Sequence, residues 1–273
     1  MDYKFKTATA GEFLFDYINT SLIGRKNLSQ ISSLDALQIG GRQQELSSYY
    51  SGILAANILS RIIKKANRVV SDIESEKEHQ KLMIQYFQRS LEIPRTPSGV
   101  DLDRLAALAL EAEKTSRKDI ISSVRSQFTV TKVNYCYMCG AQVYEKTAIA
   151  SHKMELEHIW PQSFGGDSTV ENLLPACPPC NSEKGSMILW QNAHIHSFTL
   201  KPEPSSDELT SIKKKVKIAQ HRREMFEYAS THRKTLKDAA LAIGSFNFNE
   251  VSAIDRDDAV DFFNFQIKRR YAV

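Results

Sequence analysis

The first half of the chain carries hydrophobic residues at three- and four-residue steps, the spacing that places them on one face of an α-helix. The longest such pattern covers residues 53–70 and resumes over 82–91, across a strongly polar stretch. One long helix and two stacked helices both fit this interruption. Pro94 and the turn residues Thr96–Gly99 end the element, and Asp101 is placed to cap a further helical pattern that continues to Phe128. We therefore expect a helical N-terminal region.

The pattern changes near Phe128. Residues 128–133 alternate with a period of two, which favours a strand or an extended linker, and residues 135–191 contain the Cys, Pro and Gly residues of a compact metal-bound module. After Pro202 and Pro204, Ser205–Asp207 can cap another helix, and helical spacing follows. The sequence thus predicts a mainly α fold with a small α+β module. The expected divisions are a helical domain at 1–130, the module at 131–200 and a helical C-terminal region at 201–273.

The bulk properties are those of a globular protein. Hydrophobic residues make up 42% and charged residues 25% of the chain, and the net charge of +4 permits a nucleic-acid partner without requiring one. The N-terminus has no apolar stretch of signal-peptide length, and the most apolar segment, residues 52–63, is too short and too interrupted to cross a bilayer. We expect a cytoplasmic protein without a membrane partner.

The cysteines point to a metal site. The chain has four, and they form two C-x-x-C pairs, Cys136 with Cys139 and Cys177 with Cys180. Disulfides are a poor interpretation in a reducing cytoplasm, whereas two such pairs a few tens of residues apart are typical of a tetrahedral zinc site.

Residues 154–185 carry the candidate chemistry. On a short strand Glu155 and Glu157 would share one face with His158 at its end, and Asn181 would follow the second cysteine pair on a short helix. Hydrolysis of a phosphodiester needs an activated water and charge relief for the leaving oxygen. A histidine suits the first role as general base, and a hard divalent ion on a carboxylate and an amide oxygen, here Glu157 and Asn181, suits the second.

These residues resemble the HNH, or ββα-metal, nuclease family, in the branch with a four-cysteine zinc knuckle. The resemblance covers about a fifth of the chain and rests on several elements in the family's order. These elements are Glu157-His158-Ile159-Trp160-Pro161, Gly165-Gly166, Asn172-Leu173, and Cys177-Pro-Pro-Cys180-Asn181-Ser-Glu-Lys184. Two positions depart from the commoner pattern: Glu157 replaces Asp, which places the metal one methylene further out, and Asn181 replaces His.

The resemblance implies a role for each matching residue. His158 would activate water, Glu157 and Asn181 would hold a catalytic Mg²⁺ or Mn²⁺, and Asn172 would brace the loop and orient the histidine. The four cysteines would bind a structural Zn²⁺. For Glu155, a solvated carboxylate is favoured over a second residue at the metal.

Several basic residues are candidates for nucleic-acid binding. Lys184 either contacts a phosphate or lies on the exposed side of its helix, and the basic helix beyond residue 207 is either a solvated face or a contact with the phosphate backbone. The candidates are Lys184, Lys213, Lys214, Lys215 and Arg222.

Three functional hypotheses follow. The first is a DNA endonuclease that nicks, or that cuts both strands as a homodimer. The second is a zinc-stabilised nucleic-acid-binding protein without catalysis. The third is an effector, by analogy with HNH modules of bacterial defence and restriction systems, whose N-terminal helical domain binds a protein partner or silences the nuclease.

Overall fold

The N-terminal helices form where the hydrophobic spacing predicts them. The computed structural model describes residues 4–23, 43–94, 100–131, 133–191 and 205–246. Helix α3 spans Gln43–Asp72 and helix α4 spans Glu76–Ser90, so the interrupted pattern corresponds to two helices. The interruption is the polar stretch, which cannot line a core, while Leu59, Ile62 and Ala66 of α3 are fully buried.

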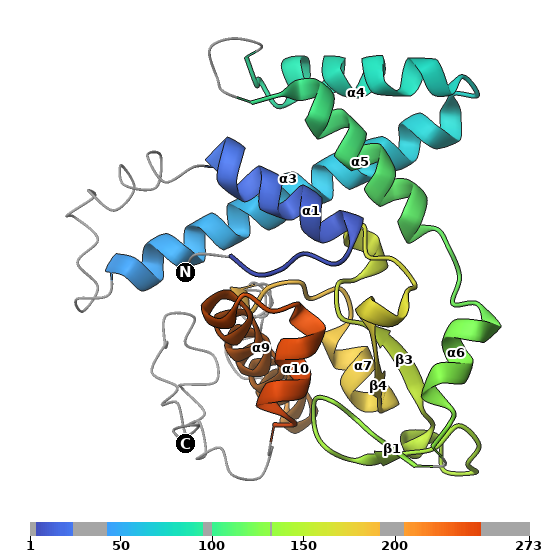
Figure 1. Ribbon diagram of the computed structural model, residues 1–273. Helices are drawn as coiled ribbons and strands as arrows, with labels where there is room; N and C mark the ends of the chain where they lie inside the picture. The colour runs from blue at the N-terminus through green and yellow to red at the C-terminus, as the bar shows by residue number, and fades with distance from the viewer. Residues whose placement is uncertain (1–3, 24–42, 95–99, 132, 192–204, 247–273) are drawn as a thin grey trace.

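The remaining N-terminal elements complete a helical layer. Helix α1 (Ala10–Tyr17) continues into a π-helical turn (Ile18–Ile23) and packs against α5 (Leu102–Ser116), which also contacts α3 and α4 (Figure 1). The Asp101 side chain accepts a hydrogen bond from the Arg104 backbone N–H, which confirms the predicted cap. Helix α6 (Ser122–Phe128) follows. Residues 129–131 form no strand, so the linker alternative is correct for them.

The central module consists of two small antiparallel sheets and a short helix. Strand β1 (Asn134–Tyr135) pairs with β2 (Gln142–Val143), and β3 (Glu155–His158) pairs with β4 (Leu173–Ala176), with His158 opposite Leu173. Helix α7 (Pro178–Lys184) follows β4. Three 3₁₀ turns connect these elements, at Ala150–His152, Gln162–Phe164 and Val170–Asn172. The expectation of a mainly α fold with a small α+β module is confirmed.

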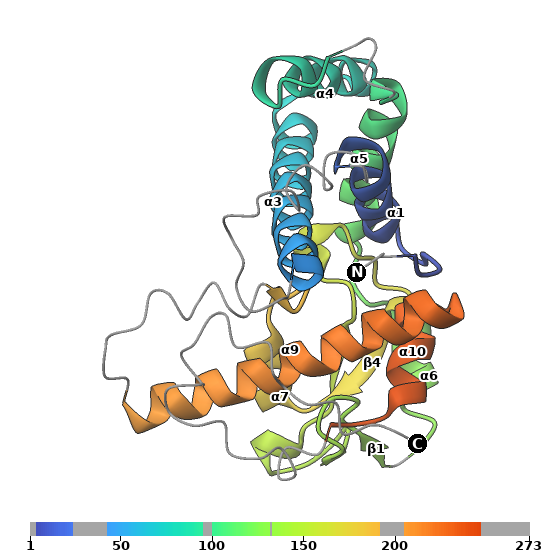
Figure 2. The same cartoon turned by 90° about the vertical axis from the view of Figure 1, so that its left-hand side faces the viewer.

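A long C-terminal helix covers the module. Helix α9 (Ser206–His232) begins with a capping box formed by Ser205 and Glu208, as predicted, and it crosses the module while packing against α7 and α10 (Leu236–Ile243) (Figure 2). Phe246, which follows α10, is buried. No described helix is long and apolar enough to cross a membrane.

One hydrophobic core joins the three parts of the chain. The contact between α1 and the module is especially close: the Gly11 N–H donates to the Gly165 carbonyl at 2.9 Å, and a Cβ at Gly11 would lie only 2.4 Å from the Phe164 carbonyl oxygen. The ring of Phe15 meets Trp160 edge-on at 5.3 Å. The division at residues 130 and 200 stays a prediction.

Candidate active site and zinc site

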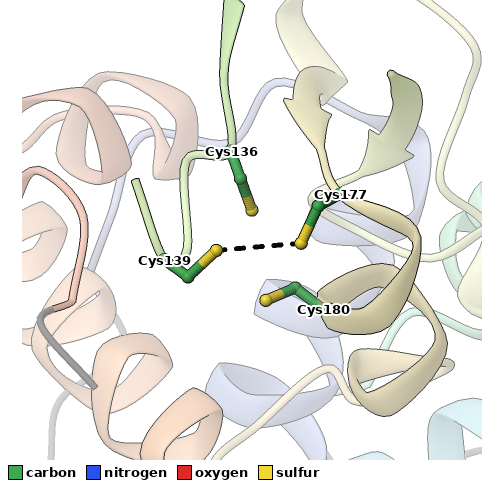
Figure 3. A group of neighbouring side chains, drawn as sticks. All are labelled: Cys136, Cys139, Cys177 and Cys180. Atoms are coloured by element: carbon green, nitrogen blue, oxygen red, sulfur yellow. Dashed lines mark hydrogen bonds between the residues drawn. The ribbon is translucent and has the colours of Figure 1, made fainter. Parts of the chain in front are cut away.

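The four cysteines converge on one point. Cys136 and Cys139 come from the turn between β1 and β2, and Cys177 and Cys180 from the start of α7 (Figure 3). Their sulfur atoms all lie within 4.8 Å of one another, and those of Cys139 and Cys177 are 3.7 Å apart. Four thiolates about 2.3 Å from a tetrahedral zinc ion stand about 3.8 Å from each other. The spacing therefore fits a structural Zn²⁺.

The charge state of these thiols also favours a cation. The interaction with Cys139 lowers the pKa of Cys136, whereas the interaction with Cys136 raises the pKa of Cys180. At this spacing the sulfurs cannot all lose their protons unless a positive charge lies among them. Zinc supplies that charge, and among the described residues no other group of three or more His, Cys, Asp or Glu side chains converges in this way.

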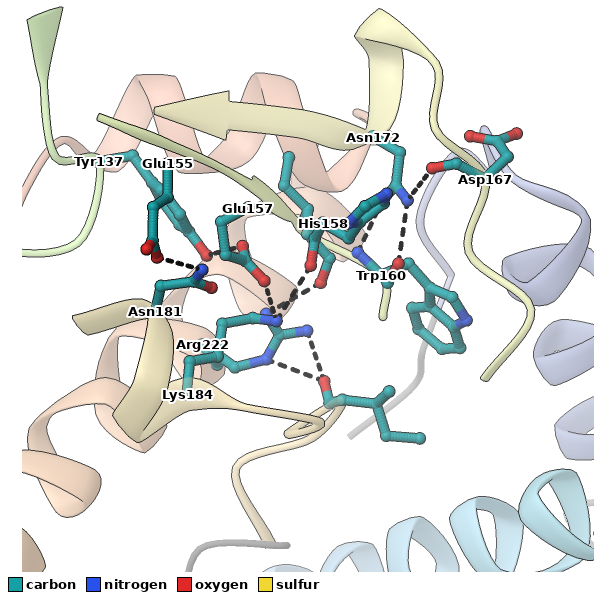
Figure 4. A network of polar contacts seen from close by, with 12 residues as sticks. Tyr137, Glu155, Glu157, His158, Trp160, Asp167, Asn172, Asn181, Lys184 and Arg222 are labelled. Carbon is teal, nitrogen blue, oxygen red and sulfur yellow. Dashed lines mark hydrogen bonds and ion pairs between the residues drawn. The ribbon is translucent and has the colours of Figure 1, made fainter. Parts of the chain in front are cut away.

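Successive side chains of strand β3 point to opposite faces, so its acidic residues and His158 lie on different faces. Glu155 and Glu157 share one face of the strand, as the sequence predicts, and this face is turned toward α7 (Figure 4). Glu157 is 4% exposed, its Oε2 accepts a hydrogen bond from the Tyr137 hydroxyl at 2.8 Å, and its Oε1 forms an ion pair with the Lys184 ammonium group (Figure 4). Both carboxylate oxygens of Glu157 are therefore engaged by groups of the protein.

Burial shifts the pKa values of Lys184 and Tyr137, the two residues that contact the Glu157 carboxylate. Burial lowers the pKa of Lys184 to about 8, and the Glu157 carboxylate opposes this shift. Burial and the same carboxylate raise the pKa of Tyr137 well above its ordinary value. The phenol therefore stays protonated and donates a hydrogen bond to Glu157. Near neutral pH the ammonium group balances the carboxylate, as a buried charge requires.

Asn181 contacts the other acidic residue of β3. Its Nδ2 donates a 2.7 Å hydrogen bond to Oε2 of Glu155, and both residues are half-buried (Figure 4). A carboxylate and an amide carbonyl are the oxygen ligands that a hard divalent ion prefers. Asn181 is thus hydrogen-bonded to Glu155, and Glu157 is paired with Lys184. That Glu157 and Asn181 together hold the catalytic metal stays a proposal.

The face shared by β3 and α7 can hold a divalent ion in one of two ways. Glu155 offers its carboxylate beside Asn181 without breaking an ion pair. Glu157 becomes a ligand only when Lys184 withdraws or loses its proton, because an additional divalent charge beside a protonated, fully buried ammonium group is strongly repelled. The residues therefore fit the ion.

His158 lies on the opposite face of β3. Its Nε2 is 3.0 Å from the Ser168 hydroxyl oxygen. Burial, with a smaller contribution from Lys184, lowers the pKa of His158 to about 4. The imidazole is consequently neutral at pH 7 and can accept a proton, as a general base must.

Asn172 braces the loop between β3 and β4. Its Oδ1 accepts from the Trp160 N–H at 2.7 Å, and its Nδ2 donates to the carbonyls of Trp160 and Asp167 at 2.9 and 2.8 Å. Its own carbonyl accepts from Ile159, the residue after His158. A Cβ at Gly166 would lie 1.7 Å from the Trp160 carbonyl oxygen, so this tight loop needs glycine there. These contacts hold the loop in place, and the predicted role of Asn172 in orienting His158 stays a proposal.

Two predicted nucleic-acid contacts require correction. Lys184 and Arg222 are each 2% exposed. The Arg222 guanidinium donates to the carbonyls of Ile188 and Ile159 and so ties α9 to the module. A side chain buried in this way does not reach a phosphate backbone, so Arg222 has a structural role and Lys184 is the partner of Glu157.

The other basic candidates lie along α9. Lys214 and Lys215 are half-buried, and Lys215 lies 3.7 Å from Glu183 in an ion pair. The side chain of Lys213 lies outside the described residues. A contact between these lysines and a nucleic acid stays a prediction.

The comparison with known families now has a structural context. Residues 136–191 match the family model described as HNH endonuclease. The match covers about a fifth of the chain and includes both cysteine pairs, His158 and Asn181. No curated protein and no solved structure matches the chain. The zinc-knuckle HNH segment is therefore identified at residues 136–191.

Two residues of the HNH segment carry no signal in the sequence that would mark them as functional. Tyr137 lies between the first two cysteines, where a hydrophobic residue could simply cover the zinc site, and Ser168 lies in the polar loop after Gly166. Only the fold brings Tyr137 to Glu157 and Ser168 to His158. Both contacts join residues ten or more positions apart, so local spacing cannot predict them.

Proposed function

We propose that this protein is an HNH endonuclease that hydrolyses phosphodiester bonds in DNA. The observation that carries the proposal is the half-buried His158 on a strand whose other face presents the Glu155 carboxylate to Asn181, within a segment that matches the HNH family. The zinc site stabilises this arrangement, because it clamps the turn between β1 and β2 to the start of α7.

Each residue of the proposed site has one task. His158 takes a proton from the attacking water, and Asn172 holds the loop that follows it. Asn181, with a carboxylate of β3, holds a Mg²⁺ or Mn²⁺ ion. When bound, such an ion neutralises charge on the phosphate and the leaving oxygen. One site of this kind cuts one strand per encounter, so we propose nicking, with double-strand cutting by a homodimer as an extension.

The proposal is tested with supercoiled plasmid. We expect purified zinc-loaded protein to convert it to the open-circular form only when Mg²⁺ or Mn²⁺ is added, and His158→Ala to reduce the rate by about 10²- to 10⁴-fold, the usual contribution of a general base. His152→Ala is the matched control, because His152 is exposed in a turn of the same segment. Equal rates for the parent and His158→Ala would refute the role of His158.

A second measurement identifies the carboxylate at the metal. Glu155→Gln and Glu157→Gln keep side-chain size and remove one charge each, and Mn²⁺ binding to both proteins can be followed by electron paramagnetic resonance. The family pattern points to Glu157, and the contact with Asn181 points to Glu155. Asn181→Ala should weaken binding in either case. If all three variants bind Mn²⁺ as the parent does, the ion is not held on this face.

One observation favours a second function, zinc-stabilised DNA binding without turnover. The Lys184 ammonium group neutralises Glu157, the acidic residue that the family pattern places at the metal. Tight plasmid binding with no product at any metal concentration would support this alternative.

We also propose that the helical N-terminal domain provides a docking surface for a protein partner. Nuclease activity that appears only when a partner is added would support this proposal.

A further inference from the structure

The hydroxyl group of Ser168 lies at the centre of a hydrogen-bond network that ends on His158. The Ser168 hydroxyl donates to the Lys118 carbonyl oxygen at 2.6 Å, and the same oxygen accepts from Gln162 Nε2 at 3.2 Å. His158 Nε2 is the third neighbour, at 3.0 Å. Ser168 is 7% exposed, so water has little access to this network.

The bonding capacity of a serine determines the direction of the third bond. A hydroxyl group has one hydrogen to donate and two lone pairs to accept with. A carbonyl oxygen can only accept, so the hydroxyl hydrogen is used on Lys118. Only lone pairs of Ser168 then remain for Gln162 Nε2, which shares its two hydrogens among three acceptors, and for His158 Nε2. The bond between Ser168 and His158 therefore exists only if His158 Nε2 carries a hydrogen and donates it.

We infer that Ser168 is a positioning residue for the proposed nuclease: it selects the tautomer of His158 with hydrogen on Nε2 and leaves Nδ1 as the nitrogen that accepts a proton from water. This inference rests on the proposed function for its catalytic meaning. No hydrogen bond to Nδ1 occurs within the part of the chain that the structure describes. One tautomer, and not a mixture, then presents its lone pair to the substrate.

The helical N-terminal part supplies the acceptor that completes this network. Lys118 follows α5, and Gln162 also donates to the carbonyls of Ser116 and Lys118 at 3.0 and 3.2 Å. The orientation of the proposed base thus depends on an atom that lies outside the segment matched to the HNH family. Hydrogen bonds from Gln162 and Ser168 hold the end of α5 against the loop that follows β3.

Nitrogen NMR of the full chain tests the tautomer without any activity. Histidine labelled with ¹⁵N gives one pair of ring-nitrogen signals per residue, and the pair missing in His158→Gln identifies His158. We expect the signature of hydrogen on Nε2 in the parent and in Ser168→Thr, which keeps the hydroxyl group. We expect a mixture of tautomers in Ser168→Ala. Ser163→Ala is the matched control, since Ser163 is exposed in the same loop.

Plasmid cleavage tests the catalytic consequence. We expect kcat of Ser168→Ala to fall about tenfold, the order of one hydrogen bond's net contribution, with KM unchanged and with recovery in Ser168→Thr. Hydrogen on Nδ1 of His158 in the parent would overturn the inference, and this reading needs only the assignment variant His158→Gln to fold. A fixed Nε2 tautomer with unchanged kcat in a Ser168→Ala protein would overturn the positioning role. A plasmid that the parent never cuts would refute the proposed function instead, and the spectrum would still decide the tautomer.

Discussion

Replacement of Asn172 by alanine tests whether the loop after β3 depends on one side chain. Asn172 is 2% exposed, and its amide group bonds three backbone groups: the N–H and carbonyl of Trp160 and the carbonyl of Asp167. Alanine leaves these groups without a partner. Each unsatisfied buried polar group costs roughly 1–3 kcal/mol, and removal of the amide's own desolvation cost offsets a part. We expect a loss of about 4 kcal/mol in the free energy of unfolding.

Urea denaturation of the zinc-loaded protein measures this loss. The matched control is Asn181→Ala, the same chemical change in the same segment. There a half-buried amide loses its hydrogen bond to Glu155, and we expect a loss of at most about 1 kcal/mol in the free energy of unfolding. A second variant, Asn172→Asp, keeps the acceptor for Trp160 and faces two carbonyl oxygens with a carboxylate, so it should be at least as unstable as Asn172→Ala. The reasoning is refuted if Asn172→Ala costs no more than Asn181→Ala.

Three further predictions concern stability. Cys177→Ser should lose zinc and unfold the HNH segment, since structural zinc contributes on the order of 10 kcal/mol; stoichiometric zinc and an unchanged melting curve would contradict this. Burial raises the pKa of Glu12 from 4.5 to about 7, so its contribution to stability is complete below pH 4.5 and is lost as the pH rises through 7. Glu12→Gln should therefore gain about 3 kcal/mol over the parent at about pH 8 in urea denaturation, and parallel pH profiles would exclude this cause. Arg222→Met should lower the free energy of unfolding by about 3 kcal/mol, because the buried carbonyls lose their hydrogen bonds from Arg222. The control Lys215→Met should change it little. A normal urea midpoint for Arg222→Met would show that α9 is held in another way.

Local patterns in the sequence were sufficient for the elements of the fold and for the zinc site. A helix is recognised because its buried face repeats every three or four residues, and Asp101 and Ser205 lie beside the N–H groups that they cap. The zinc site is recognisable because the two cysteines of each C-x-x-C pair lie only three positions apart, so each pair supplies two neighbouring ligands. The order of motifs around His158 likewise predicted the HNH segment, and the family match agrees.

Only the tertiary structure decided which charged groups are paired and which are exposed. Helix α9 carries basic residues all around, so its sequence does not show that Arg222 enters the core. The partners of Glu157, Asn181 and His158 lie 10 to 27 positions away along the chain. A spacing of three or four residues predicts a helix face because the backbone imposes it, whereas the meeting of Ser168 with Lys118 depends on how helices and loop pack together.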